Sequence, residues 1–205
     1  MQIERAFLGI ETLGPGKRFA LWVNGCRRKC PGCVSEGLRK FAPQNDIDVI
    51  QYLSEFDFGG TDGITISGGE PFEQAEDLAK TTEYFNRIGI EDILVYTGFT
   101  IDELRGLKDK NVDYTLQNIA VLIDGPYVRE SDLGVGNLKG SGNQNIIFLK
   151  PEFKDRYEAF YRDSRSMQEF SICDTVIAIG IPDKKYIIKF MKDTEVKNDR
   201  IRKRT

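Results

Sequence analysis

Three of the four cysteines in this 205-residue chain, Cys26, Cys30 and Cys33, lie within eight residues of one another. A tight loop with this spacing can direct three thiolates at one cubane iron–sulfur cluster, and Pro31 and Gly32 suit the sharp bend that such a loop needs. Most cubane clusters take four cysteines and only transfer electrons. Three cysteines leave one iron open, and an open iron can bind a ligand through amino and carboxylate groups.

The absence of histidine and the clustering of the cysteines exclude several other roles for these cysteines. It has no histidine, which excludes Ser–His and Cys–His catalytic pairs, histidine-ligated zinc and imidazole general bases. A disulfide framework would spread cysteines along the chain, whereas clustering in a reducing cytosol indicates metal binding. A zinc site would need a fourth ligand, and the remaining Cys173 is distant and precedes an apolar run. Zinc binding and a purely structural role stay open on the cysteines alone.

Composition limits the partners and the compartment. The net charge of −3 gives no reason to expect nucleic-acid binding. No apolar run is long enough to cross a bilayer, so no membrane partner is expected. The first residues carry no basic region followed by a hydrophobic stretch, as a signal peptide would, so a cytoplasmic location is expected.

The elements that must position the cysteines follow from apolar patterning. Runs rich in β-branched and aromatic residues predict strands over residues 18–23, 63–66, 93–96, 120–123 and 145–149. Apolar residues at helical spacing predict helices over 47–56, 72–88 and 101–107. Thr100 is the expected N-cap of the last of these helices, with Glu103 completing a capping box. Alternating strands and helices predict an α/β fold with parallel strands.

Chemically capable residues come directly after four of these strands. In chain order they are Cys26, the motif Gly68-Gly69-Glu70, Thr97 and Asp124. In α/β barrels the carboxyl ends of the strands carry the active site. The four groups are therefore expected to meet on one face of the fold.

The cysteine motif resembles the signature of the radical S-adenosylmethionine (SAM) superfamily. Residues 25–33 have the Cys-Pro-Gly-Cys form typical of the activating proteins of anaerobic ribonucleotide reductases. Residues 14–16, 21–24, 67–71, 96–100, 122–125 and 140–144 also resemble that group, in the family's order. The resemblance covers roughly the first three quarters of the chain, which a chance match of one motif would not do.

The resemblance implies a 4Fe-4S cluster on Cys26, Cys30 and Cys33, with SAM bound beside it. It implies that Glu70, in a Gly68-Gly69-Glu70 turn, contacts the methionine amino group. The alternative for Glu70 is a strand-to-helix turn in which it favours a helix N-terminus.

Further SAM contacts are implied at the next two strand ends, by Thr97 and Asp124, although Asp124 also suits a simple turn. Gly32 lacks the aromatic side chain that many relatives place before the third cysteine, so the adenine contact is expected from the Gly32 backbone and from Val34. Asn143, with Ser141 and Gln144, is expected near SAM or the substrate's entry.

The implied reaction is reductive cleavage of SAM to a 5′-deoxyadenosyl radical, which removes a hydrogen atom from its target. The expected target is a backbone glycine of a glycyl-radical enzyme resembling ribonucleotide reductase. The basic run of residues 27–29 either offsets the charge of the cluster or contacts an acidic reductant such as flavodoxin. A solvated loop is the plain alternative for this run.

The resemblance also predicts an incomplete β/α barrel over residues 1–150, since a complete eight-unit barrel needs about 200 residues or more. Residues 151–205 are expected to form a C-terminal α+β extension. It would contain a helix over 152–165 and a hairpin of strands at 174–181 and 185–191. Two alternatives remain: a radical SAM enzyme acting on a peptide, nucleotide or small molecule, and a non-catalytic iron–sulfur or zinc-binding protein.

Overall fold

The computed structural model describes residues 1–132, 134, 136–172, 175–183 and 186. Structural statements below refer to these residues. Cys173 lies outside them, as does most of the strand predicted over residues 185–191.

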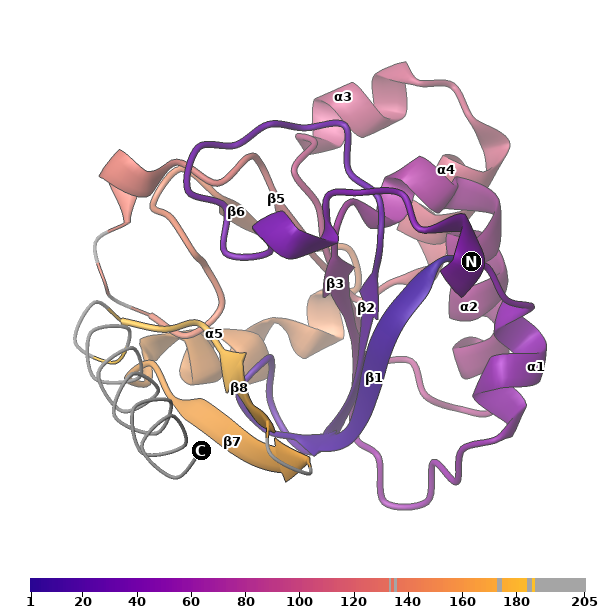
Figure 1. Cartoon of the computed structure of the whole chain (residues 1–205), viewed down its shortest axis with the longest axis horizontal. Helices are drawn as coiled ribbons and strands as arrows, with labels where there is room; N and C mark the ends of the chain where they lie inside the picture. The colour runs from indigo at the N-terminus through magenta and orange to yellow at the C-terminus, as the bar shows by residue number, and fades with distance from the viewer. Residues whose placement is uncertain (133, 135, 173–174, 184–185, 187–205) are drawn as a thin grey trace, which may run out of the picture.

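A six-stranded sheet forms the centre of the fold, with its strands in chain order (Figure 1). The strands are β1 (Ile3–Ile10), β2 (Arg18–Val23), β3 (Gly63–Gly68), β4 (Ile93–Tyr96), β5 (Val121–Asp124) and β6 (Asn145–Phe148). The strands β2 to β5 are parallel, whereas β1 and β6 run antiparallel to their neighbours at the two edges. The mixed α/β class is thus confirmed, with a mostly parallel sheet.

Helices follow the parallel strands and cover the sheet. They are α1 (Val49–Ser54), α2 (Ala75–Arg87), α3 (Ile101–Gly106), α4 (Lys110–Asn118) and α5 (Lys154–Arg162). The capping box of Thr100 and Glu103 at the start of α3 is confirmed. The sequence prediction missed β1 and α4, and the helix predicted over 152–165 is shorter than expected.

Both faces of the sheet are buried, as parallel strands require. In β4, Ile93 and Val95 pack on the side of α1 to α4, whereas Leu94 packs on the side of α5 against Tyr157. Figure 1 shows α1, α2 and α4 to one side of the strands and α5 to the other. This packing fixes the carboxyl ends of β2 to β5 along one edge of the sheet.

Arg18 lies fully buried at the opposite ends of these strands. Its guanidinium donates to Thr65 Oγ1 at 2.7 Å, to the Ile64 carbonyl at 2.6 Å and to Asp92 Oδ1 at 3.1 Å. The hydroxyl of Tyr157, from α5, also donates to Asp92 Oδ1. A buried charge is tolerated where it is paired and hydrogen-bonded, and this cluster meets that condition.

A two-stranded sheet follows α5. It is formed by β7 (Met167–Ile172) and β8 (Thr175–Gly180), which pair antiparallel. The predicted strand over 174–181 corresponds to β8. Its partner is β7, which the sequence prediction missed because polar and apolar residues alternate in it too weakly to stand out from a loop.

Candidate functional site

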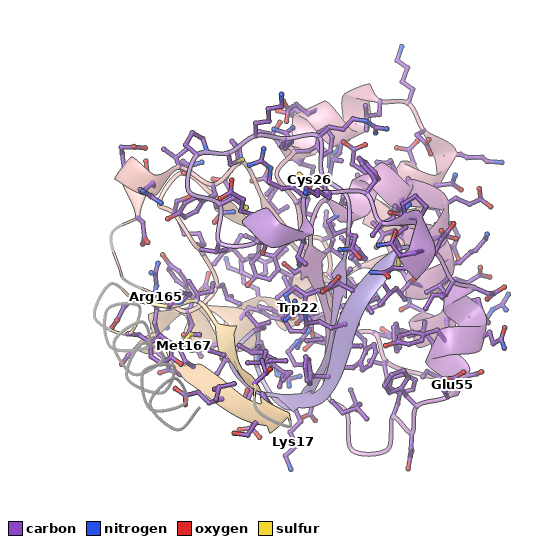
Figure 2. The ribbon with its side chains drawn as sticks, in the orientation of Figure 1. Lys17, Trp22, Cys26, Glu55, Arg165 and Met167 are labelled. Atoms are coloured by element: carbon purple, nitrogen blue, oxygen red, sulfur yellow. The ribbon has the colours of Figure 1, made fainter. Side chains whose placement is uncertain are left out.

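A cavity of about 590 Å³ opens at the carboxyl ends of β2, β3 and β4. Cys26, Cys30 and Cys33 line it and are all half-buried. In Figure 2, Cys26 lies above Trp22, which also lines the cavity. The structure therefore brings the three cysteines to the strand ends, as the order of motifs predicted.

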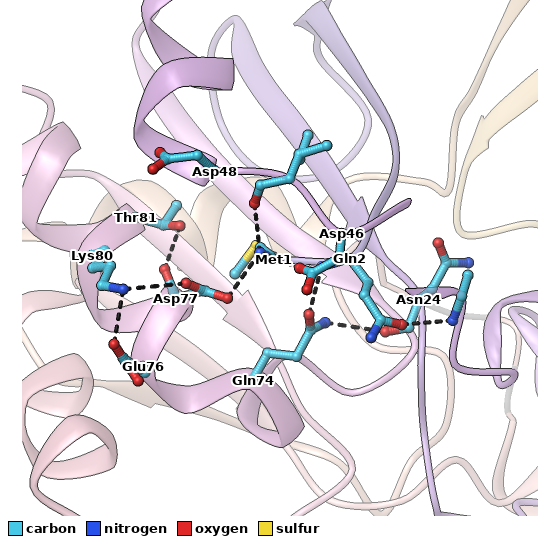
Figure 3. A network of polar contacts seen from close by, with 12 residues as sticks. Met1, Gln2, Asn24, Asp46, Asp48, Gln74, Glu76, Asp77, Lys80 and Thr81 are labelled. Atoms are coloured by element: carbon cyan, nitrogen blue, oxygen red, sulfur yellow. Dashed lines mark hydrogen bonds and ion pairs between the residues drawn. The ribbon is translucent and has the colours of Figure 1, made fainter. Parts of the chain in front are cut away.

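The start of the cysteine loop is held by a network of amide groups (Figure 3). Asn24 N donates to the Gln2 carbonyl at 2.9 Å, and Gln74 Nε2 donates to the Asn24 carbonyl at 3.1 Å. Gln2 N in turn donates to Gln74 Oε1 at 2.6 Å. Nearby, the Met1 ammonium contacts carboxylates of Asp46 and Asp77. Asn24, which lies just before the cysteine loop, is thereby fixed to Gln2 directly before β1 and to Gln74 in the turn that leads into α2.

Close backbone approach explains the two glycines after β3. Gly68 has a φ of 116°, and a Cβ added to it would lie 2.4 Å from Val23 N. A Cβ on Gly69 would lie 2.3 Å from the Gly25 carbonyl oxygen. Glu70 N donates to that same carbonyl at 2.8 Å. The glycines therefore let the end of β3 pack directly against the cysteine loop.

The Glu70 carboxylate joins the ends of β3 and β4. It accepts hydrogen bonds from Thr97 Oγ1 at 2.8 Å, from Gly98 N at 2.7 Å and from Phe72 N at 3.1 Å. Glu70 is 1% exposed, and burial raises its pKa from 4.5 to about 7 against the opposing effect of these hydrogen bonds. Glu70 thus caps the turn at Pro71–Gln74, as its alternative reading proposed, and also lines the cavity.

The thiols of Cys26 and Cys33 lie in surroundings that disfavour their charged form. Burial raises the pKa of Cys26 and of Cys33, and the neighbouring cysteines raise both further. Binding of iron must therefore displace their protons. Among the described residues no three Cys, Asp or Glu side chains converge as a single metal ion requires. Each thiolate on a cubane binds a different iron, so a cluster does not need that convergence.

The other expected SAM contacts separate into two groups. Val34 and Thr97 line the cavity together with Gly68, Gly69 and Glu70. The side chains of Asp124 and Asn143 are used by the chain itself. Asp124 accepts from Ile101 N at 2.8 Å and from Asn145 Nδ2 at 2.8 Å. Asn143 Nδ2 donates to the Pro126 carbonyl at 2.7 Å.

Gly32 leaves room for an arginine. A Cβ at Gly32, whose φ is 68°, would lie 2.3 Å from the guanidinium of Arg129. Gly32, Asp124 and Asn143 are absent from the lining of the cavity, whereas Gln144 is part of it. Ser141 is buried and accepts a hydrogen bond from Val128 N at 3.1 Å.

Arg28 and Tyr96 also line the cavity. The sequence prediction considered Arg28 only as part of the basic run of residues 27–29, and it gave Tyr96 no role. The Arg28 guanidinium lies 4.2 Å from the centre of the Phe99 ring and donates to Glu103 at 2.9 Å, while its Nε has no hydrogen-bond partner among the described residues. The Tyr96 hydroxyl is buried and also has no partner in the part of the chain that the structure describes, and burial raises its pKa above the ordinary value. Arg28 lies within the cysteine loop and Tyr96 directly precedes Thr97. Their position next to these expected site residues could have identified them from the sequence.

Comparison with known proteins identifies relatives of the chain. Residues 12–147 match the family described as "4Fe-4S single cluster domain". The anaerobic ribonucleoside-triphosphate reductase-activating protein of Escherichia coli K12 is 33% identical over 151 residues, which are 67% of this chain and 92% of the relative. The protein of the same name from Enterobacteria phage T4 is 28% identical over 143 residues, 65% of this chain and 85% of the relative. The pyruvate formate-lyase-activating enzyme of Staphylococcus aureus USA300 is 24% identical over 156 residues, 69% of this chain and 59% of the relative.

Proposed function

The chain belongs to the 4Fe-4S single cluster domain family together with activating proteins of anaerobic ribonucleotide reductases, and from this we propose that it is a radical SAM activase. Its cofactors are a 4Fe-4S cluster and SAM, and its partner is a glycyl-radical enzyme. The observation that carries the proposal is that Cys26, Cys30, Cys33 and Glu70 line one cavity at the ends of neighbouring parallel strands.

The donor set fits a cluster with one open iron. Three half-buried thiols face the cavity, and the chain contains no histidine that would complete a zinc site. We assign cluster binding to Cys26, Cys30 and Cys33. When bound, the cluster and SAM supply reductive cleavage to a 5′-deoxyadenosyl radical and hydrogen abstraction from a glycine of the partner.

The chain's own residues position these groups and keep water away. We propose that Gly68, Gly69, Glu70 and Thr97 contact SAM, because they line the cavity on the side of the cysteines. Glu70 presents a carboxylate whose three hydrogen-bond donors are already fixed, so its position does not depend on the ligand. Val34, 69% exposed beside Cys33, supplies an apolar contact for the adenine.

The remaining predicted contacts act from outside the cavity lining. We propose that Asp124 holds the start of α3 and the first residue of β6, and that Asn143 holds the turn at Pro126. Gly32 then contributes only backbone atoms to the cysteine loop, and its lack of a side chain leaves room for the guanidinium of Arg129.

Finer assignments concern the architecture, the electron donor and the location of the protein. We propose that the sheet is an incomplete barrel, that residues 1–150 form its core and that residues 151–205 form an extension. Flavodoxin or a similar reductant is the proposed electron donor, since Lys29 is exposed and Arg27 is 72% exposed in its side chain despite its contact with Glu73. None of the helices in the described part of the chain is long and apolar enough to cross a membrane, and a cytoplasmic location is proposed.

Anaerobic reconstitution with iron and sulfide tests the function. We expect about four irons per chain, 5′-deoxyadenosine from SAM under reducing conditions, and a glycyl-radical electron paramagnetic resonance (EPR) signal on added anaerobic ribonucleoside-triphosphate reductase. Cleavage of SAM without a radical signal on any glycyl-radical enzyme would favour the alternative of a peptide or small-molecule substrate. Zinc content without SAM cleavage would contradict the proposal as a whole.

A further inference from the structure

The cavity has a second wall that lies away from the cysteines. It is formed by Met167 at the start of β7, by residues 177–182 along and after β8, by Leu13 in the connection between β1 and β2, and by Trp22 of β2. In Figure 2, Met167 and Arg165 lie to one side of Trp22, away from Cys26. One cavity therefore runs from the cysteine loop to the hairpin of β7 and β8.

The hairpin is attached to the end of β1 by specific contacts. Gln168 Oε1 accepts from Glu11 N at 2.6 Å, and Gln168 Nε2 donates to the Gly9 carbonyl at 3.1 Å. The rings of Phe7 and Phe170 stack with their centres 5.4 Å apart. These contacts hold β7 of the hairpin against the end of β1.

Arg165 joins the hairpin to the glycine-rich loop that precedes β6. Its side chain is 4% exposed and donates to Asp132 Oδ1 at 2.9 Å and to the carbonyls of Gly136, Lys139 and Pro182 at 3.1, 2.9 and 3.1 Å. Pro182 follows β8, and Asp132 itself lines the cavity. A planar guanidinium with five donors is suited to fixing several acceptors at once.

The charges on the cavity lining do not suit a phosphorylated substrate. Among the described residues of the lining, the cations are Arg5 and Arg28. Arg5 is paired with Glu4 at 3.3 Å, and Arg28 with Glu103 at 2.9 Å. Recognition of a nucleotide phosphate requires unneutralised cations or convergent backbone donors. The residues of the second wall are apolar, which suits an uncharged polypeptide segment.

The hairpin part of the second wall, unlike Leu13 and Trp22, lies outside the part of the chain that matches the family. The family match ends at residue 147, before α5 and the hairpin begin. The shared part supplies the cysteines and the strand ends, so the hairpin can alter what enters the cavity without altering the cluster site.

We propose that the β7–β8 hairpin, fixed by Arg165, is the specificity-determining wall that receives an uncharged polypeptide segment of the partner enzyme. The inference rests on the proposed function, because the partner's segment would carry the glycine that loses a hydrogen atom.

Ala178→Asp tests the wall, since Ala178 is a half-buried residue of its lining. Thr175→Asp is the matched control, because it adds the same charge to an exposed residue of the same strand that is not part of the lining. For Ala178→Asp we expect unchanged iron content and unchanged SAM cleavage without partner. The KM for the reductase in the radical assay should rise at least about tenfold at similar kcat, whereas Thr175→Asp should match the parent chain.

Trp22 provides a second measurement that does not need the cluster, because it is the one tryptophan of the sequence and lines the cavity. A tryptophan-free peptide spanning the reductase's radical-bearing glycine should change Trp22 fluorescence of the cluster-free full chain, and ATP should not. Ala178→Asp should weaken the peptide titration. Arg165→Met should weaken it too, with partial recovery in Arg165→Lys.

Three outcomes would overturn the inference. The first is an unchanged KM and an unchanged peptide titration in Ala178→Asp. The second is loss of iron or of SAM cleavage in that variant. The third is a Trp22 response to ATP in place of the peptide. Failure of the parent chain itself to cleave SAM would instead contradict the proposed function, so the two failures are distinguishable.

Discussion

Thr97 Oγ1 donates a hydrogen bond of 2.8 Å to Glu70 Oε1, joining residues at the ends of two adjacent parallel strands. Because Glu70 N also donates to the Gly25 carbonyl, this bond links the Glu70 carboxylate, the cysteine loop and the connection between β4 and α3 into one unit. Gly98 N completes it by donating to the other oxygen of the same carboxylate at 2.7 Å. The chemical behaviour of this unit can be tested without the cofactors.

Glu70 should make the cluster-free protein less stable as pH rises. Its folded-state pKa, about 7, lies above the ordinary 4.5, so the folded chain holds a proton that the unfolded chain releases. The free energy of unfolding should therefore fall between pH 4.5 and 7, by up to about 3 kcal/mol from this group. Glu70→Gln should flatten that part of the profile. Denaturant unfolding at several pH values measures it, and an identical slope in both proteins would contradict the assignment.

The cysteine loop should lose its cluster when any one of its cysteines is replaced. Cys30→Ser removes one of three thiolates, and we expect little bound iron after reconstitution and no 5′-deoxyadenosine. Cys173→Ser is the control and should retain about four irons per chain. Iron analysis and chromatography of the nucleoside give both readings. Equal losses in the two variants would indicate a four-cysteine site.

Gly68→Ala should destabilise the fold through its backbone. The residue has a φ of 116°, and its added Cβ would lie 2.4 Å from Val23 N, so we expect a loss of at least about 2 kcal/mol. Gly106→Ala is the matched control. Gly106 ends α3 with no atom within 4 Å of an added Cβ, and the change should add about 0.5–1 kcal/mol. Thermal and denaturant unfolding compare the two, and similar effects of both changes would argue against the close approach of β3 to the cysteine loop.

Arg18→Met should be among the most destabilising single changes in the core. It removes the buried cation paired with Asp92, which is 3% exposed, and leaves the exposed Arg156 at 3.3 Å and the Tyr157 hydroxyl as partners. Breaking a buried pair costs up to about 3–5 kcal/mol. Arg87→Met, which removes an exposed pair with Glu83, should cost less than about 1 kcal/mol. The midpoint of urea unfolding separates these values, and a shift for Arg18→Met no larger than for Arg87→Met would refute the role of the buried cluster.

The parallel strands and the cysteine loop could be predicted because each carries a local signal. Residues 19–23 and 93–96 are continuous runs of apolar and aromatic residues, and the cysteines are spaced within one loop. β1 was missed because Glu4 and Arg5 interrupt its apolar pattern. The burial of Arg18 could not be predicted, since its acceptors come from segments as distant as Thr65 and Asp92 and exist only after folding.

The candidate site shows the same division. The gathering of Cys26, Glu70 and Thr97 was predictable because strand order fixes where strand ends meet. The use of both Asp124 oxygens by Ile101 and Asn145 was not, since a carboxylate at a strand end suits a ligand and a turn equally well. The residues of the hairpin that line the cavity were also hidden, because no motif marks residues 177–182.

The buried cluster of Arg18, Asp92 and Tyr157 bears on how the chain is made. Its members are far apart in the sequence and are therefore synthesised at different times. Arg18 belongs to the second strand of the main sheet, whereas Tyr157 belongs to α5, which follows the last strand of that sheet. While the ribosome is still adding α5, the face of the sheet around Leu94 and Asp92 has no cover. The sheet that carries the cysteine loop therefore completes its core only after α5 has emerged.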